Sequence, residues 1–248
     1  MLQLGMKSDL GQARIANEDS CLARVLASQG EKLALLAVAD GIGGHRAGEV
    51  ASRTAINCLE SAVITALEKG EALLLSLERA VRSANQTVFE LATLQEQFSG
   101  MGTTLTTAVL SSQRLFAAHV GDSRLYLYRA GTCSQLSIDH NLVSELVKNG
   151  EISADEAKSH PQRNVLTRAV GIGAKVEIDL ITQSLLPGDV VLLASDGLFT
   201  LLDNQAIARH LTTEQDLQKV AENLVAAANE LGGHDNISVV LAKWGWDG

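Results

Sequence analysis

Acidic residues recur in this sequence at the points where short hydrophobic segments begin or end. Six of them share this placement: Glu18, Asp19, Asp40, Asp122, Asp196 and Asp235. A carboxylate at the rim of a hydrophobic strand is costly to desolvate unless a positive group satisfies it, and a hard divalent cation with oxygen ligands can do so. Gly41, directly after Asp40, would let the backbone approach the same cation with its carbonyl. The placement of the acids therefore predicts a divalent-cation site.

Each acid taken alone has a simpler explanation. An Asp before a Gly is a favoured turn pair, and an Asp after a strand often caps a helix. Arg14, four residues before Glu18, is open to two interpretations in the same way. It is either a bidentate clamp for a phosphate oxyanion or a surface arginine that pairs with Glu18 or Asp19. The repetition of acids at strand ends favours the site over a series of unrelated turns.

The elements that must position these acids are short strands and three long helices. Segments of five to nine residues rich in Val, Leu, Ile and Thr predict strands, at 3–11, 20–28, 32–40, 103–111, 114–122, 124–130, 189–196 and 237–244. Apolar residues at helical spacing predict helices over 45–69, 71–97 and 213–231. The strands come in clusters and the helices in pairs, which differs from the alternating βαβ pattern. We expect an α+β fold of two antiparallel sheets with helices packed outside.

Composition excludes several classes of protein. The chain has 29 Asp and Glu against 20 Lys and Arg, and Phe, Tyr and Trp together make up 3% of it, so it lacks both the basic stripe and the stacking residues of a nucleic-acid binder. An apolar fraction of 46% excludes a disordered chain. No linker-like stretch divides the sequence, so we expect one domain over 1–248. The polar segment 149–164 is predicted to be a surface excursion.

The expected compartment is the cytoplasm. Cys21, Cys58 and Cys133 are odd in number and widely spaced, which indicates neither a disulfide framework nor a zinc site. The N-terminal residues contain no apolar stretch of signal-peptide length, and the most apolar run, 33–39, is far shorter than a membrane span. We therefore expect no association with a membrane.

Eight motifs resemble one family in its order along the chain. They span residues 14–19, 38–52, 100–110, 119–127, 136–152, 164–171, 192–199 and 234–241. Among them are VADGIGGH, HVGDSRLYL, LLASDGLF and HDNISVVL. Together they resemble the bacterial form of the PPM (type 2C) metal-dependent protein serine/threonine phosphatases, from about Gly5 to Trp244. A single Asp-Gly motif would be weak support, whereas eight motifs in order are strong support.

The resemblance implies a role for each acid. Asp40 would bridge two metal ions, and the Gly41 carbonyl would bind the second of them. Asp196 and Asp235 would complete the first metal site. Glu18 and Asp19 would act on the second mainly through coordinated water, and Asp122 with Asp196 would hold a third, weaker metal.

The resemblance also implies the remaining parts of the site and the fold. Arg14 would hold the phosphate, and Asn236 would orient the loop of the acid before it. The family fold is a four-layer α-β-β-α sandwich, with a flap subdomain near 149–164. The implied cofactors are two Mn²⁺ or Mg²⁺ ions with a third in some members, and oxygen-only ligands agree with these metals over zinc.

The implied activity is hydrolysis of phosphoserine and phosphothreonine on proteins by a hydroxide bound to the dinuclear centre. The implied partners are phosphorylated proteins, including a serine/threonine kinase or its targets, and the protein is expected to be a monomer that binds no nucleic acid. Two alternatives remain at this point. One is a phosphatase-like scaffold with little turnover, and the other is a phosphatase of small-molecule phosphoesters, which would use the same metal residues.

Three histidines near the motifs receive separate interpretations. Many eukaryotic members of the family have a His directly after the Asp-Gly pair, where this chain has Ile42. His45 is the nearby candidate for the proton donor, and its alternative is a helix N-terminal residue with no such role. We interpret the Asp139-His140 pair as a structural turn and His119, which lies in an apolar run, as a satisfied core histidine.

Overall fold

Two antiparallel β-sheets lie at the centre of the computed structural model, which describes residues 2–28, 30–43 and 46–244. The first sheet runs in the spatial order β1 (Leu2–Asp9), β11 (Ile237–Trp244), β10 (Val190–Ala194), β7 (Arg124–Arg129) and β8 (Thr132–Gln135). The second runs β2 (Asp19–Ser28), β3 (Glu31–Ile42), β5 (Leu105–Leu110), β6 (Arg114–Val120) and β9 (Asp179–Ser184), and the short β4 (Gly102–Thr103) pairs with the end of β3.

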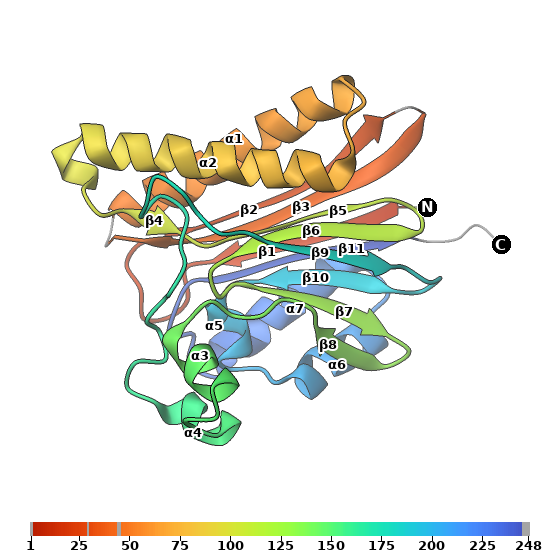
Figure 1. Ribbon diagram of the computed structural model, residues 1–248. Helices are drawn as coiled ribbons and strands as arrows, with labels where there is room; N and C mark the ends of the chain where they lie inside the picture. The colour runs from red at the N-terminus through yellow and green to blue at the C-terminus, as the bar shows by residue number, and fades with distance from the viewer. Residues whose placement is uncertain (1, 29, 44–45, 245–248) are drawn as a thin grey trace.

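Helices cover the outer face of each sheet (Figure 1). On the second sheet lie α1 (Arg46–Glu68) and α2 (Leu73–Leu94), followed by the 3₁₀ turn η1 (Glu96–Phe98). On the first lie α5 (Asp196–Phe199), α6 (Asn204–Thr213) and α7 (Leu217–Glu230). The remaining helices, α3 (Leu142–Lys148) and α4 (Ala154–Ser159), belong to the connection between β8 and β9. The four layers confirm the predicted α-β-β-α sandwich.

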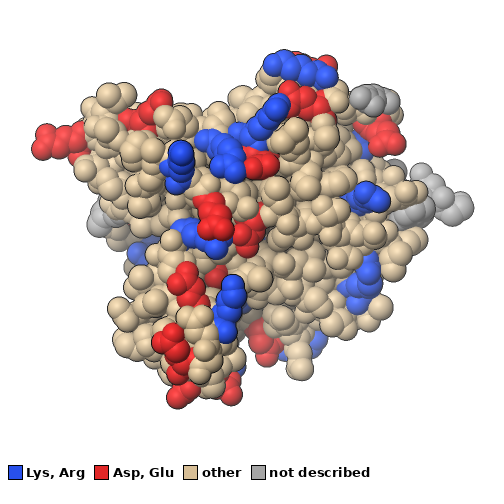
Figure 2. All heavy atoms as spheres, viewed as in Figure 1, with Lys and Arg blue, Asp and Glu red and all other residues tan. Residues whose placement is uncertain are grey.

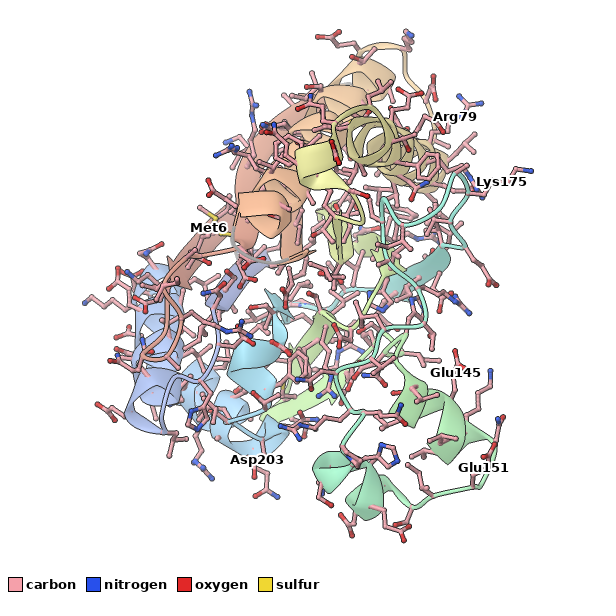
Figure 3. All side chains as sticks on the ribbon, turned by 90° about the vertical axis from the view of Figure 1, so that its left-hand side faces the viewer. Met6, Arg79, Glu145, Glu151, Lys175 and Asp203 are labelled. Carbon is pink, nitrogen blue, oxygen red and sulfur yellow. The ribbon has the colours of Figure 1, made fainter. Side chains whose placement is uncertain are left out.

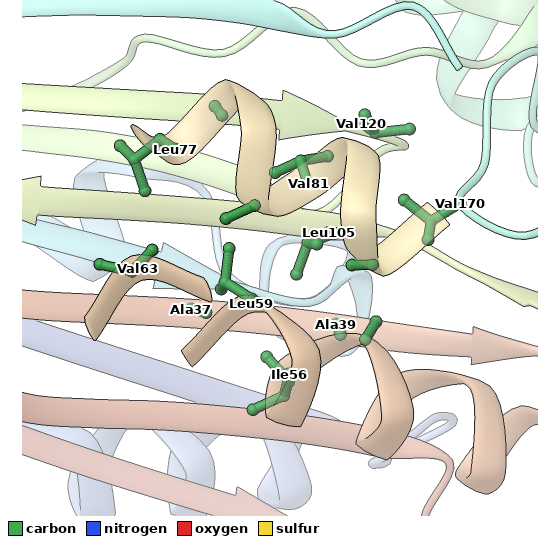
Figure 4. Packing of buried hydrophobic residues seen from close by; sticks show 14 of the residues in the cluster. Ala37, Ala39, Ile56, Leu59, Val63, Leu77, Val81, Leu105, Val120 and Val170 are labelled. Atoms are coloured by element: carbon green, nitrogen blue, oxygen red, sulfur yellow. The ribbon is translucent and has the colours of Figure 1, made fainter. Parts of the chain in front are cut away.

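The hydrophobic core is divided among the layers. One cluster joins α1 and α2 to the second sheet, and Figure 4 shows Ile56 and Leu59 of α1 with Leu77 and Val81 of α2 above the strands. A second cluster joins α6 and α7 to the first sheet, and a third lies between the two sheets. Small and aliphatic residues dominate all three, as the low aromatic content implies. Burial on both faces explains why most strands read as continuous apolar runs instead of alternating ones.

Most predicted elements are present, with different bounds at several ends. The predicted helix 213–231 begins at Leu217, because Asp216 caps α7 by accepting a hydrogen bond from the backbone of Gln218 at 2.9 Å. The predicted helix 71–97 ends at Leu94, where Gln95 takes an extended backbone. Strand β9 was not predicted, because it is an edge strand with exposed and half-exposed residues in alternation and carries few of the apolar residues that mark a strand.

The segment between β8 and β9 carries the predicted polar excursion. It contains α3 and α4, and α4 begins with a capping box between Ser153 and Glu156. None of the α4 residues is buried. Figure 3 shows the labelled Glu145 and Glu151 at the lower end of this view, far from Arg79 on α2. Only α4 lies within the predicted excursion 149–164, since α3 ends at Lys148, and the sequence pattern predicted neither helix.

On the face shown in Figure 2, Lys and Arg lie beside Asp and Glu and form no continuous basic stripe. Within residues 2–28, 30–43 and 46–244, no helix has both the length and the apolar character needed to cross a bilayer.

Candidate metal centre

Strand register brings the first acids together. In the antiparallel pair β2–β3, Asp19 lies directly opposite Asp40. The backbone N–H of Gly41 donates to the Glu18 carbonyl at 3.2 Å, which extends the same ladder by one bond. Sequence placed each of these residues at a strand end, and the register now places them at the same end of the same sheet.

The other sheet supplies the remaining acids in a similar way. Strand β10 pairs with β11, and Asp196 follows the end of β10 while Asp235 precedes the start of β11. The backbone N–H of Ser195 donates to the Ser238 carbonyl at 3.1 Å and holds these two segments together. Asp196 and Asp235 therefore emerge side by side, and the sandwich faces them toward Asp40.

The acids lie close enough together to raise one another's pKa values. Burial raises the pKa of Asp40 well above its usual range, and the charges of Asp19, Asp196, Asp122 and Asp235 raise it further. Five carboxylates that act on one another in this way form a single cluster. Such a cluster is unfavourable in the folded chain unless protons or cations neutralise part of its charge.

Asp19 and Asp196 show the same effect with different surroundings. Burial raises the pKa of Asp19 to about 7, against a hydrogen bond that the Ser195 hydroxyl donates to its Oδ2 at 2.7 Å. Burial and the charge of Asp235 raise the pKa of Asp196 to about 6, against the attraction of Arg14. Each of these two residues keeps one buried carboxylate oxygen without a hydrogen-bond partner.

Asp122 joins the cluster from the turn between β6 and β7. It is 9% exposed, and burial and the charge of Asp196 raise its pKa to about 7. The Asn141 side chain hydrogen-bonds Asp122 and partly offsets this effect. The structure thus places Asp122 beside Asp196.

Arg14 and Asn236 organise the exposed rim. The Arg14 guanidinium is about half exposed and donates from Nη2 to Asp235 at 2.7 Å. This differs from the alternative partner weighed from the sequence, which was Glu18 or Asp19. The Asn236 side chain accepts from the Glu18 backbone at 2.8 Å and donates to the carbonyls of Leu10 and Ala16 at 2.9 and 3.0 Å. Asn236 therefore ties the last strand to the loop that carries Arg14.

Close backbone packing explains two glycines of the motifs. A Cβ on Gly41 would collide with the carbonyl of Gly48 in the first turn of α1, and a Cβ on Gly197 would collide with the carbonyl of Asn236. Both glycines follow acids of the cluster. The backbone next to Asp40 and Asp196 is therefore packed at a distance that any side chain would prevent.

The residues present fit hard divalent cations. Their donors are oxygen atoms, two buried carboxylate oxygens lack a partner, and the acids raise one another's pKa. Among the described residues, no three His, Cys, Asp or Glu side chains lie close enough together to hold an ion between them. Asp235 is paired with Arg14 and Asp19 with Ser195 instead. Small side-chain rotations and bound water would complete the coordination, as is usual for Mg²⁺ and Mn²⁺.

The remaining histidine predictions have mixed outcomes. His45 lies outside the described residues. His119 is confirmed as a core histidine, fully buried between the Thr106 hydroxyl at 2.9 Å and the Ile138 carbonyl at 3.0 Å. The Asp139-His140 pair contacts the Asp122 turn, a role that sequence reasoning did not assign.

Two hydroxyl residues of the site were not singled out from the sequence. Ser195 donates to Asp19 and accepts from the Ser238 backbone at 2.9 Å. Thr104 accepts a hydrogen bond from the backbone N–H of Asp40 at 2.8 Å, and its own hydroxyl lies 2.7 Å from that of Ser123. The only signal was adjacency, since Ser195 precedes Asp196 and Ser123 follows Asp122.

The sequence matches one family along almost the whole chain. The model of the family described as Protein phosphatase 2C matches residues 10–241. The serine/threonine phosphatase stp of Listeria innocua is 37% identical over 239 residues, which are 96% of this chain and 94% of that protein. The chain belongs to the protein phosphatase 2C family.

Solved structures of relatives agree with this assignment. The crystal structure of the Mycobacterium tuberculosis serine/threonine phosphatase PstP/Ppp superimposes with a TM-score of 0.88 at 38% identity and covers 99% of both chains. The catalytic domain of the serine/threonine protein phosphatase PstP in complex with two manganese ions gives a TM-score of 0.84 at 36% identity, covering 98% of this chain and 97% of that one. The full-length PstP protein is longer, and this chain covers 45% of it.

Proposed function

We propose that this protein hydrolyses phosphoserine and phosphothreonine monoesters on proteins with two Mn²⁺ or Mg²⁺ ions. The observation that carries the proposal is the cluster of Asp19, Asp40, Asp122, Asp196 and Asp235, whose members raise the pKa of Asp40 together. No described cation of the chain other than Arg14 is bonded to this group. The family membership and the relatives named as serine/threonine phosphatases support the same reaction.

We assign the metal-holding role to the acids by position. Asp40, at the centre of the cluster, would bridge the two ions, with Asp196 and Asp235 on one side and Glu18, Asp19 and the Gly41 carbonyl on the other. Asp122 with Asp196 would form a third site. When bound, such a pair of ions activates a water molecule and offsets charge on the phosphoryl group.

Arg14 supplies the phosphate-binding group in this proposal. A guanidinium has five N–H donors, and Asp235 accepts from one of its nitrogen atoms. The side chain is 52% exposed at the rim of the acidic cluster. Its other donors are therefore available to phosphoryl oxygens, which a planar guanidinium binds in a bidentate manner. Arg14 would orient the phosphoryl group while the Asp235 contact keeps the side chain over the cluster.

We also propose the wider setting. Residues 1–248 would form one phosphatase domain with a flap subdomain near 149–164, where exposed α4 lies. The protein would act as a monomer in the cytoplasm on phosphorylated proteins, including a serine/threonine kinase or its targets. The three cysteines are free thiols, which suits a reducing compartment.

The test compares wild type with Asp40→Asn on a phosphothreonine peptide over a range of MnCl₂ concentrations. We expect Mn²⁺-dependent phosphate release from wild type and a loss of more than about 100-fold in Asp40→Asn, because the central carboxylate would be gone. Glu96→Gln, which removes one exposed acid in η1, is the control and should behave as wild type. Circular dichroism would check that each variant folds. Equal activity of Asp40→Asn and wild type would disprove the assignment of Asp40.

The same assay separates the alternative functions. Wild type that releases phosphate from small phosphoesters much faster than from phosphopeptides would favour a metabolite phosphatase. Wild type that binds a phosphopeptide without releasing phosphate at any Mn²⁺ concentration would favour a scaffold. We do not expect the scaffold outcome, because all the acids of the cluster are present. A small-molecule phosphatase would use the same acids, so against that alternative the proposal rests on the relatives named as serine/threonine phosphatases.

A further inference from the structure

Three consecutive residues after β8 hold the turn that carries Asp122. Asp139 accepts from the Arg124 guanidinium at 3.0 Å from Nε and 2.7 Å from Nη2. The backbone N–H of His140 donates to the Gly121 carbonyl at 2.8 Å, and the Asn141 side chain hydrogen-bonds Asp122. The turn is thus bonded on both sides of Asp122 by one short segment.

The central contact is made by the His140 ring. The backbone N–H of Gly121 donates to His140 Nδ1 at 3.1 Å. Nδ1 can accept this bond only when it carries no proton, so the ring proton must lie on Nε2. The bond acts one residue before Asp122, at a glycine whose φ of 106° few other residues adopt. The ring tautomer therefore decides whether the turn can take this conformation.

Asp179 of β9 fixes the tautomer. Its Oδ2 lies 3.1 Å from His140 Nε2, and a carboxylate accepts a hydrogen bond but cannot donate one when ionised. Arg168 donates to Asp179 Oδ1 at 2.8 Å and holds the carboxylate in place. Burial opposes ionisation of Asp179, but its bonds with His140 and Arg168 lower its pKa, so it stays an acceptor.

A second group also faces His140 Nε2. Arg168 Nη1 lies 3.3 Å from this nitrogen, but its bond to Asp179 Oδ1 at 2.8 Å is shorter, and Asp179 Oδ2 is the closer partner of the ring nitrogen. His140 is 5% exposed, and its ring lies 4.7 Å from the buried ring of His119. Burial lowers the pKa of His140 more than its acidic partner raises it, so the ring remains neutral. A neutral ring with Nδ1 protonated would turn a hydrogen bond into a contact between two donors at Gly121.

We infer that His140 is a positioning residue for Asp122, and that Asp179 sets the His140 tautomer that the Asp122 turn requires. The inference deepens the proposed function and rests on it for the role of Asp122 as a metal ligand. It predicts that the ability of Asp122 to bind a cation depends on a carboxylate that does not itself contact Asp122. A purely structural role for the pair predicts loss of stability with no specific change in cation binding.

The decisive variant is Asp179→Asn, which is nearly isosteric and lies on an edge strand. The Asn amide can donate to His140 Nε2 and so stabilise the wrong tautomer. Glu177→Gln is the matched control, because it removes one acidic charge beside Arg168 without contacting His140. Asp122→Asn provides the reference for loss of the ligand itself.

Two measurements test the inference. Long-range ¹H–¹⁵N NMR of the metal-free protein reports the His140 tautomer, and we expect Nε2–H in wild type and Glu177→Gln and a shift toward Nδ1–H in Asp179→Asn. Electron paramagnetic resonance of free Mn²⁺ reports binding directly. We expect Asp179→Asn to weaken the weakest Mn²⁺ site about tenfold, as loss of a group that orients a ligand does in other metal sites. The effect should vanish in the Asp122→Asn background.

A second pair of variants separates the two ring nitrogens. His140→Asn places an amide oxygen near the position of Nδ1 and should keep most of the Mn²⁺ affinity. His140→Gln reaches toward Asp179 but offers no acceptor to Gly121, and it should bind as weakly as Asp179→Asn.

The outcomes are distinct from those for the proposed function. An unchanged tautomer in Asp179→Asn, or a Mn²⁺ affinity equal to that of Glu177→Gln, would overturn the inference even if wild type is an active phosphatase. Wild type that binds Mn²⁺ but releases no phosphate would count against the proposed function alone. Additive losses in the Asp122, Asp179 double variant would also overturn the inference, because His140 would then act elsewhere.

Discussion

Buried carboxylates occur in two kinds of surroundings in this protein. Asp139 and Asp189 are buried and each receives a bidentate contact from an arginine, Arg124 and Arg129 respectively. Asp19 and Asp122 are just as buried, but their pKa values rise to about 7. An arginine of the chain neutralises Asp139 and Asp189, and these ion pairs stabilise the fold. Asp19 and Asp122 have no such arginine among the described residues, so a proton or a bound cation must neutralise their charge.

The two kinds of acid meet near one turn of the fold, the turn between β6 and β7. Asp122 lies in the turn, and Arg124 begins β7 two residues later. The Arg124 guanidinium donates to Asp139 and stacks over the Phe199 ring, with Cζ 3.8 Å from the ring centre. The described ion pair of this guanidinium is therefore with Asp139 and not with Asp122. Arg124 thus helps to fix the turn around Asp122 through its bond to Asp139.

The largest effect expected from this comparison is on catalysis. Asp196→Asn should lower Mn²⁺-dependent phosphatase activity by more than about 100-fold, since Asp196 contributes to two of the proposed cation sites. Activity on a phosphothreonine peptide at saturating MnCl₂ measures this. The variant should remain folded, and activity within a few-fold of wild type would show that Asp196 belongs with the structural acids.

The opposite behaviour is expected at Asp139. Asp139→Asn should lower the free energy of unfolding by about 3 kcal/mol, because Arg124 would lose its buried partner. Urea denaturation followed by circular dichroism measures this in EDTA and in MnCl₂. The loss should be the same size in both. A loss confined to the Mn²⁺-loaded protein would place Asp139 among the cation-binding acids.

The pH dependence of stability sharpens the comparison further. The folded-state pKa of Asp122 is raised from its usual 3.8 to about 7, so its protonated form favours folding. The metal-free protein should therefore lose stability as pH rises from about 4 through about 7, and Mn²⁺ should restore it most at pH 8.

The matching variant isolates the contribution of Asp122. Asp122→Asn should raise the melting temperature of the metal-free protein at pH 8 by about 3 °C, roughly 1 kcal/mol for a chain of this size, and change it little at pH 4.5. Differential scanning fluorimetry in EDTA measures both values. A lower melting temperature of Asp122→Asn at pH 8 would contradict the prediction that the ionised Asp122 carboxylate destabilises the metal-free protein.

The smallest effect is expected at a solvent-exposed pair. Arg53 donates to Glu49 four residues earlier in α1 at 2.8 Å, and both side chains are about half exposed. Arg53→Gln should change the free energy of unfolding by less than about 0.5 kcal/mol in either EDTA or MnCl₂. The urea titration used for Asp139→Asn provides the comparison. A larger change would mean that the exposure of an ion pair does not predict its contribution to the free energy of unfolding.

The sequence was sufficient to find the acids, but it did not show which of them pair with an arginine and which belong to the acidic cluster. Asp122 and Asp139 each follow an apolar segment, and nothing in the chain near Asp139 shows that Arg124 will reach it from across a turn. The register that sets Asp19 opposite Asp40 likewise depends on long-range strand pairing, which local patterns do not encode. The apolar strands and amphipathic helices were predictable because burial dictates their spacing.

Residues that act through hydrogen bonds were the hardest to predict. Ser195 follows β10 and Thr104 lies between β4 and β5, and their importance appears only once Asp19 and the Asp40 backbone lie beside them. The same is true of Asp179, which lies on an edge strand that the sequence pattern did not reveal. The Ser195 and Thr104 contacts join residues more than 60 positions apart, and Asp179 on β9 contacts a histidine in the connection between β8 and α3.

The pairing of β1 with β11, from Leu2 opposite Trp244 to Asp9 opposite Ile237, has a consequence for synthesis on the ribosome. The earliest strand of the first sheet has no neighbour until the last one emerges, whereas β2 and β3 can pair almost at once. Glu18, Asp19 and Asp40 would thus be in place long before Asp196 and Asp235 are made. A nascent chain would carry half of an acidic centre without its counterpart, so phosphatase activity should appear only after β11 has left the ribosome.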